Sequence, residues 1–282
     1  MASRAITRTP IAALAVILVL SGCASLLSAG APAPVSEIAP GLLAGYLPKA
    51  SLPDSLALLP PPPATGTAAM ALDEAFARST FAQRGSPRWA LAEADANLAF
   101  PEAAGVFSCA LGAPISQEAT PRLYRLLRRT LTDAGLSTYG AKNRYQRARP
   151  FAANEQPICT EGERAALAKD GSYPSGHTAI GWAWALVLSE IAPDRANALF
   201  ARGLAYGESR NICNVHWRSD VQSGLVMGAA TVARLHADAE FRHDLDAANT
   251  ELANVRAKGL RPGRDCAQEA AALAPPAAAD GR

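Results

Sequence analysis

The segment from His177 to Ile191 constrains the fold most, because its side chains would be apolar on almost every face of a helix. A helix that is hydrophobic all round is buried inside a protein or a membrane. With about 15 residues, this segment is shorter than a comfortable bilayer span, and Pro193 follows it closely. The sequence therefore predicts a central core helix around which the rest of a domain must pack.

Helical patterns dominate the chain from Ala69 onward, and the alternation typical of strands is almost absent. Several segments begin after Pro, Ser or Thr and end near Gly or Pro, as helices commonly do. We therefore expect one all-α domain, a helical bundle over residues 68–257. Its predicted helices cover residues 71–83, 87–111, 121–134, 161–169, 177–191, 195–208, 217–238 and 241–257.

The two ends of the chain differ from this domain in composition. Residues 1–22 have a basic start and a short apolar run, as a secretory signal peptide does. The following Cys23 completes a Leu-Ser-Gly-Cys sequence that resembles a bacterial lipobox, so it is the expected lipidation site; ordinary cleavage nearby is the alternative. Residues 23–67 are expected to form a Pro- and Ala-rich tether, and residues 258–282 a mostly disordered tail.

A lipidated Cys23 predicts a periplasmic protein, and Ala24 beside it favours anchoring to the outer membrane. Setting Cys23 aside leaves an even number of cysteines in an oxidising compartment, where two disulfides are expected. Four cysteines allow three pairings, and buried free thiols are a further alternative. We favour one pairing because two of the cysteines lie close to motifs that must converge; it joins Cys159 to Cys213 and Cys109 to Cys266.

The charge balance argues against a nucleic-acid partner. The net charge is +2, and two of the 27 Lys and Arg residues, Arg4 and Arg8, lie in the expected signal peptide. Without them the chain has as many basic as acidic side chains. A nucleic-acid-binding protein normally has a basic face or stripe, so any functional cations here are local.

Two polar blocks suit an anion. Lys142 and Arg149 are seven residues apart, so on a helix both would point to one side and reach one anion; a solvated basic surface is the alternative. Ser175 and Gly176 precede the core helix, where free backbone N–H groups and the helix dipole attract phosphate. For Ser175, a simple N-cap role is the alternative.

A third block adds histidine chemistry. His216 and Asp220 are four residues apart, so on a helix the carboxylate would accept from one imidazole nitrogen and leave the other free to attack phosphorus. Arg210 would bind two phosphate oxygens through its forked guanidinium. A structural His–Asp hydrogen bond is the alternative. Taken together, the three blocks indicate phosphoryl transfer without a metal, and no cofactor is expected.

The three blocks read KX6RP, PSGH and SRX5HX3D, with every specified position present. This set resembles the signature of the PAP2 acid phosphatase and vanadium haloperoxidase superfamily. The strings GSYPSGHTAIGWAWALVLSEI and YGESRNICNVHWRSDV are similar to bacterial class A non-specific acid phosphatases, and the likeness extends over roughly residues 72–257. The resemblance implies an all-α helical bundle like that of vanadium chloroperoxidase.

The resemblance also implies a role for each residue. His216 would be the nucleophile that forms a phosphohistidine, Asp220 would orient it, and His177 would protonate the leaving alkoxide and then activate water. The phosphate oxygens would be held by Lys142, Arg149, Ser175, Gly176 and Arg210. Because attack needs unprotonated His216 and departure needs protonated His177, we expect a bell-shaped pH profile with an acidic to near-neutral optimum.

The implied substrates are small-molecule phosphate monoesters of broad range. The membrane would be reached only through the lipid anchor, and a homo-oligomer is left open. One alternative is a vanadium-dependent haloperoxidase, in which the same cradle holds vanadate and His216 is its axial ligand. Another is an inactive lipid-anchored binding protein that keeps the helical fold.

Overall fold

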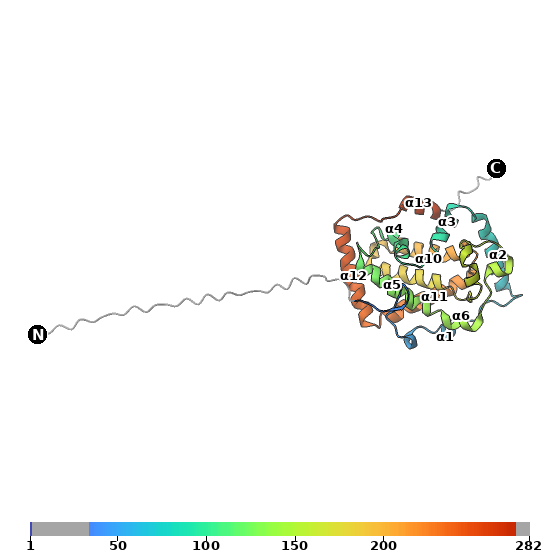
Figure 1. The fold of residues 1–282 in the computed structure, drawn as a ribbon, viewed down its shortest axis with the longest axis horizontal. Helices are drawn as coiled ribbons and strands as arrows, with labels where there is room; N and C mark the ends of the chain where they lie inside the picture. Colours follow the sequence, from blue (N-terminus) through green and yellow to red (C-terminus); the bar gives the residue numbers. More distant parts are fainter. Residues whose placement is uncertain (2–33, 275–282) are drawn as a thin grey trace. The chain divides into compact units, whose positions relative to one another are not determined.

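The computed structural model describes Met1 and residues 34–274, and residues 34–274 form a bundle of helices with one small hairpin (Figure 1). Apart from Met1, the expected signal peptide lies outside the described residues, as does the lipidation site Cys23. The strands are β1 (Glu37–Ala39) and β2 (Leu42–Leu43), which pair antiparallel. The short 3-10 helices are η1 (Lys49–Ser51), η2 (Phe81–Gln83), η3 (Glu102–Phe107), η4 (Glu161–Glu163) and η5 (Pro193–Arg195).

The α-helices follow one another along the whole described chain. In order they are α1 (Ser55–Leu58), α2 (Ala68–Thr80), α3 (Pro87–Ala94), α4 (Ser108–Leu111), α5 (Pro121–Leu136), α6 (Tyr139–Tyr145), α7 (Pro150–Asn154), α8 (Arg164–Leu167), α9 (Gly176–Ile191), α10 (Ala196–Ile212), α11 (Arg218–Leu235), α12 (Ala239–Ala257) and α13 (Cys266–Leu273). In Figure 1, α12 runs along one side of the bundle and α2 lies at the opposite side.

Helix α9 is the core helix that the sequence predicts. It packs against α5, α10 and α11, and Trp184 near its middle is fully buried. The indole Nε1 of Trp184 donates a hydrogen bond to the carbonyl of Leu127 on α5 at 2.9 Å, so its one polar atom is satisfied as burial requires. The prediction of an all-α fold is confirmed.

Close contact between α9 and α10 depends on a glycine. A Cβ atom on Gly181 would overlap the ring of Tyr206 on α10. Tyr206 is itself fully buried and belongs to the same core cluster as Trp184. A side chain at position 181 would therefore push α10 away from the core helix.

Three of the predicted helices differ most from the structure. The predicted helix 87–111 is interrupted after Ala94, and its second half consists of the 3-10 helix η3 and the single turn α4. The predicted helix 161–169 is reduced to η4 and the single turn α8. Helix α10, by contrast, extends beyond the expected residue 208 to Ile212 and so includes Arg210.

Much of the expected tether lies against the bundle. The side chains of Leu43, Tyr46 and Leu59 are buried. The Tyr46 hydroxyl donates to Asp244 Oδ2 on α12, and the Tyr46 backbone N–H donates to Asp133 Oδ2 on α5, both at 2.8 Å. These few anchoring side chains hold residues 34–67 against the bundle, where the Pro- and Ala-rich composition predicted a tether.

Both favoured disulfides are present, Cys109–Cys266 and Cys159–Cys213. The first joins α4 to the start of α13, across 157 residues of sequence. It fastens helix α13, within the expected tail, to the body of the molecule. The second joins the loop after α7 to the C-cap of α10, close to the segment that carries His216.

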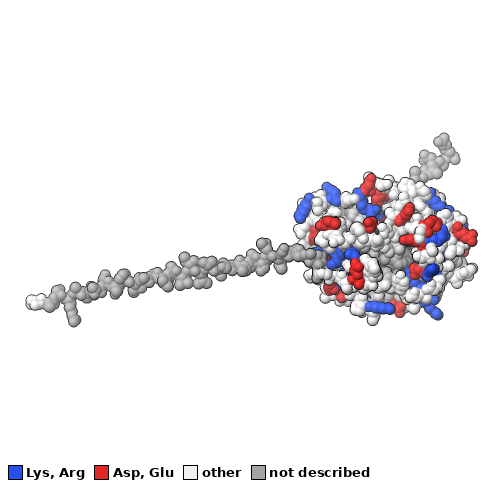
Figure 2. All heavy atoms as spheres, viewed as in Figure 1, with Lys and Arg blue, Asp and Glu red and all other residues white. Residues whose placement is uncertain are grey.

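Basic and acidic side chains are interspersed over the face seen in Figure 2. This mixture agrees with the balanced charge of the sequence. Among the described residues, the structure contains no helix with the length and apolar character needed to cross a membrane.

Candidate active site

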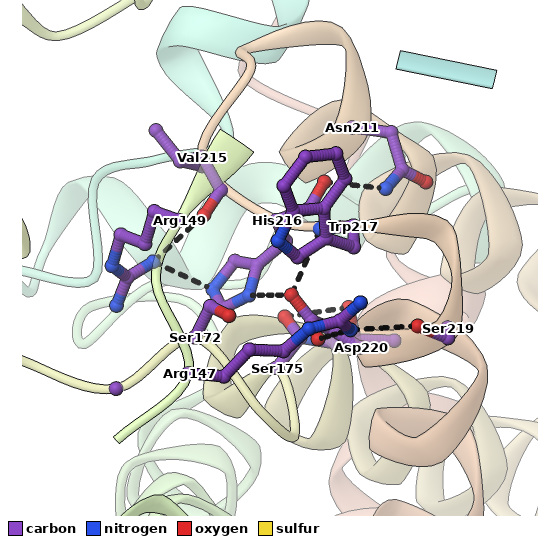
Figure 3. Close-up of polar contacts among 12 residues, drawn as sticks. Arg147, Arg149, Ser172, Ser175, Asn211, Val215, His216, Trp217, Ser219 and Asp220 are labelled. Carbon is purple, nitrogen blue, oxygen red and sulfur yellow. Dashed lines mark hydrogen bonds and ion pairs between the residues drawn. The ribbon is translucent and has the colours of Figure 1, made fainter. Parts of the chain in front are cut away.

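The three motif blocks meet at the N-terminal end of α9. The backbone N–H of Ser175, the N-cap of α9, donates to the carbonyl of Asp220 at 3.0 Å. Asp220 lies in the first turn of α11 and contacts His216, which in turn contacts Arg149 (Figure 3). The predicted site residues are therefore brought together although they come from segments far apart in the sequence.

The prediction that Lys142 and Arg149 share a helix was wrong. Helix α6 carries Lys142 and ends where Gln146 adopts a left-handed conformation, with φ of 42°. Arg149 is extended and directly precedes α7, which begins at Pro150. The two cations instead converge on Asp170, whose Oδ2 lies 3.2 Å from Lys142 Nζ and 2.9 Å from Arg149 Nη2.

His216 likewise lies in a loop before α11 rather than on a helix with Asp220. Trp217 is the N-cap of α11, and its backbone N–H donates to Asp220 Oδ2 at 2.8 Å. His216 Nδ1 lies 3.4 Å from the same oxygen. The two side chains are thus brought within ion-pair distance, but by the way the chain enters the helix and not by a helical turn.

The contacts of His216 define which of its nitrogens carries the proton. A guanidinium group only donates hydrogen bonds, so Nε2 accepts from Arg149 Nη1 at 3.1 Å. In the neutral ring the proton is then on Nδ1, facing Asp220. Burial, followed by the nearby charges of Arg149 and Lys142, lowers the pKa of His216 well below its usual value. Nε2 is therefore an unprotonated nitrogen among cations.

Asp220 is fully buried and is also held by Arg147. Arg147 Nη1 donates to its Oδ1 at 2.6 Å. Burial raises the pKa of Asp220, and the charge and hydrogen bond of Arg147 oppose that rise. Arg147 also donates to Asp73 on α2 at 2.8 Å, so this guanidinium ties the carboxylate behind His216 to another helix.

Lys142 and Arg149 are nearly inaccessible, and both donate several hydrogen bonds within the protein. Lys142 Nζ donates to the carbonyl of Gly171 as well as to Asp170. Arg149 donates to the carbonyls of Leu167, Asp170 and Val215. Burial, then the charge of Arg149, lowers the pKa of Lys142 to about 8, so Lys142 keeps its proton in acidic and neutral solution.

Arg210 differs from the other two cations. It is 1 % exposed, and among the described residues its Nε, Nη1 and Nη2 atoms have no hydrogen-bond partner. Burial lowers the pKa of Arg210 to about 10, which still leaves it charged at neutral pH. Buried charges are normally paired, so this guanidinium is suited to binding an anion.

The start of α9 provides the remaining predicted groups. The Ser175 hydroxyl accepts from the backbone N–H of Thr178 at 3.3 Å and from its hydroxyl at 2.9 Å, so Ser175 does serve as an N-cap. Gly176 follows as the first residue of the helix, where backbone N–H groups are available to an external acceptor. His177 Nε2 donates to the carbonyl of Ala96 at 2.9 Å.

The environment of His177 favours its neutral form. Burial, then the charge of Arg210, lowers the pKa of His177 well below its usual value. A bound anion would neutralise part of the charge of Arg210 and so raise that pKa again. The protonation of His177 is thus coupled to the charge of whatever occupies the site.

Sequence reasoning missed three groups in this site. Arg147 lies within the KX6RP block, which was the only signal for it, and Asp170 directly precedes Gly171, the first residue of the GSYPSGH string. The carbonyl of Ala96 has no side-chain signature at all. Within the described part of the chain, no three His, Cys, Asp or Glu side chains are grouped so as to hold a metal ion.

Comparison with known proteins gives one consistent result. Residues 126–244 match the PAP2 superfamily. A protein of Zymomonas mobilis named acid phosphatase is 43% identical over 209 residues, 74% of this chain and 79% of the relative. A non-specific acid phosphatase of Providencia stuartii is 43% identical over 75% of this chain and 86% of the relative. One of Salmonella typhimurium is 42% identical over 69% and 78%.

Proposed function

Since this chain belongs to the PAP2 superfamily and is an acid phosphatase, we propose that it hydrolyses phosphate monoesters of broad range through a phosphohistidine on His216, without a metal ion. The relatives named above are acid phosphatases, which favours this activity over the haloperoxidase and the inactive binding protein.

The observation that carries the proposal is the guanidinium of Arg210, which is buried and has no hydrogen-bond partner in the described part of the chain. Its charge acts on both His216 and His177, whose pKa values it lowers. A phosphate group bound to Arg210 would therefore lie close to both imidazoles. Lys142, Arg149 and the N–H groups at Gly176 would bind its other oxygens, which carry the charge of a loose phosphoryl transition state.

In the first half-reaction, Arg149 Nη1 turns from His216 Nε2 to an oxygen of the phosphate, which frees the lone pair of Nε2. His216 Nε2 then attacks phosphorus, and the bond to the ester oxygen breaks. The electron pair of that bond goes to the leaving oxygen, which takes a proton from His177. The attacking ring becomes positively charged, and Asp220 stabilises it by accepting from Nδ1. The substrate dianion itself favours protonated His177, because it offsets the charge of Arg210 that lowers this pKa.

In the second half-reaction, water attacks the phosphorus of the phosphohistidine. His177, now neutral, takes the proton of this water, and the P–N bond electrons return to His216 Nε2. Inorganic phosphate leaves, and both histidines are again in their starting forms. The fixed cations supply the electrostatic stabilisation throughout, so we propose that a chelator leaves the rate unchanged.

The covalent step is tested by substituting the nucleophile. His216→Ala should lower kcat for p-nitrophenyl phosphate by at least about a thousandfold. Rapid acid-free quenching with radiolabelled substrate should trap labelled wild-type protein and no labelled variant. His243→Ala is the matched control, because its side chain is 75% exposed. Label retained in His216→Ala, or turnover lost in chelator, would contradict the proposal.

We also propose that the protein is exported to the periplasm and anchored to the outer membrane through a lipidated Cys23. The lipobox-like sequence supports this, as do two disulfides, which persist in oxidising compartments. Growth with labelled palmitate should label the wild type and not Cys23→Ser, and the variant should be recovered without detergent. Equal labelling of both proteins would rule out anchoring at Cys23.

A further inference from the structure

Asp170 holds the two cations Lys142 and Arg149 in a way that resembles a bound phosphate. One carboxylate oxygen, Oδ2, accepts from Lys142 Nζ at 3.2 Å and from Arg149 Nη2 at 2.9 Å. Shared acceptance from an ammonium and a guanidinium is also how a phosphate oxygen would bind these groups. Neither the sequence motifs nor the proposed chemistry gives this carboxylate a role.

The exposure of the three side chains differs sharply. The side chains of Lys142 and Arg149 are 5% and 3% exposed, whereas that of Asp170 is 40% exposed. The cations are further fixed by backbone carbonyls, including those of Gly171 and Val215. If this contact opens, the carboxylate is therefore the partner that moves, because only it has solvent to move into.

The backbone around Asp170 does not need to move. The Asp170 carbonyl accepts from Arg149 Nε at 3.1 Å, and its N–H donates to the carbonyl of Leu167 at 3.2 Å. These bonds do not involve the carboxylate. A rotation of the side chain alone would release one hydrogen-bond donor on each of the two cations.

We propose that the Asp170 carboxylate competes with the phosphoryl group of the substrate for Lys142 and Arg149, and that its displacement limits the affinity of the site for phosphate; this inference rests on the phosphate-binding role proposed above. A phosphate dianion carries more charge than a carboxylate and also reaches Arg210, so it displaces Asp170. The carboxylate in turn satisfies the two buried cations whenever phosphate leaves.

The test is direct binding of inorganic phosphate, measured by calorimetry on the purified protein at mildly acidic pH. Asp170→Asn, which keeps the shape of the side chain and removes its charge, should bind phosphate about three- to tenfold more tightly than wild type. Asp170→Ala should do the same. In steady-state assays, KM for p-nitrophenyl phosphate should fall by a similar factor. Because phosphate should leave more slowly, kcat should not rise.

Glu163→Gln is the matched control. Glu163 is an exposed acid whose charge acts on Arg210, and its carboxylate accepts from Thr160 instead of contacting either cation. The Glu163→Gln variant therefore loses the same charge as Asp170→Asn but keeps the competing carboxylate of Asp170. We expect its decrease in log Kd for phosphate to be less than half of the decrease in Asp170→Asn.

Two results would overturn the inference. An equal increase in phosphate affinity in Glu163→Gln would mean that net charge alone sets the affinity. Weaker phosphate binding by both Asp170 variants would mean that the carboxylate positions the cations for phosphate. A wild-type protein that binds no phosphate would instead contradict the phosphate site itself. The binding readout needs no turnover, so failure of the phosphohistidine mechanism leaves it usable.

Discussion

Individual side chains in this site act through partners that are themselves buried. Asp220 contacts His216, and Arg147 holds Asp220 while also binding Asp73 and the hydroxyl of Ser219. The guanidinium of Arg147 offsets the charge of Asp220, so that His216 faces a partly neutralised carboxylate. This arrangement favours the neutral imidazole that the proposed attack requires.

Substitution of Arg147 should therefore change the pH dependence of the enzyme. The pKa of His216 lies well below its usual value, so the reactive neutral form is lost only in acid. Arg147→Gln leaves the charge of Asp220 unopposed, which raises the pKa of His216 and moves the acidic limb of the kcat/KM profile to higher pH. Because a buried ion pair is broken, the unfolding free energy should also fall by about 3 kcal/mol.

Arg144→Gln provides the comparison for this measurement. Arg144 is exposed and three residues away on α6, so the same charge change there should leave the acidic limb in place. An acidic limb that stays fixed in Arg147→Gln, with only stability reduced, would assign Arg147 a structural role alone.

At the scale of elements, the sequence predicts helices with a persistent apolar pattern and misses the loops that interrupt helices. Helix α9 is predicted to within one residue at its start, because its apolar character persists over its whole length. The break between α6 and α7 depends on a left-handed Gln146, a conformation that nothing in the residue type requires. Spacings of seven and four residues therefore predicted helices for Lys142 with Arg149 and for His216 with Asp220, where the structure has loops.

The same limit explains which site residues were predicted. Motif residues such as His216 and Arg210 are recognised by type and order along the chain. Asp170 and Asp73 are recognised only by what they touch, since acidic side chains at these positions look like ordinary surface groups in the sequence. Their contacts arise from folding and have no local signature.

At the scale of the whole molecule, the segment before α2 and the segment after α12 are both attached to the helical bundle. The segment with Tyr46 docks on α5 and α12 through Asp133 and Asp244, and α13 is fastened to α4 by the Cys109–Cys266 disulfide. Composition predicted a tether and a tail because Pro, Ala and Gly outnumber the anchoring residues. In residues 34–67 and 258–274, a few buried side chains and one covalent bond are enough to fix the chain to the bundle.

The burial of Lys142, Arg149 and Arg210 has a consequence for which esters the enzyme accepts. A monoester presents three non-bridging oxygens to these cations, whereas a diester presents two and carries a second alcohol in place of the third. A diester would therefore leave a buried donor unmatched, which is costly. We expect kcat/KM for p-nitrophenyl phosphate to exceed that for bis-p-nitrophenyl phosphate by at least about a hundredfold, and similar values for the two would contradict this. Discrimination between esters would then depend on the number of non-bridging phosphate oxygens. A leaving alcohol of almost any shape would be tolerated, whereas a polymer linked by phosphodiesters would be left intact.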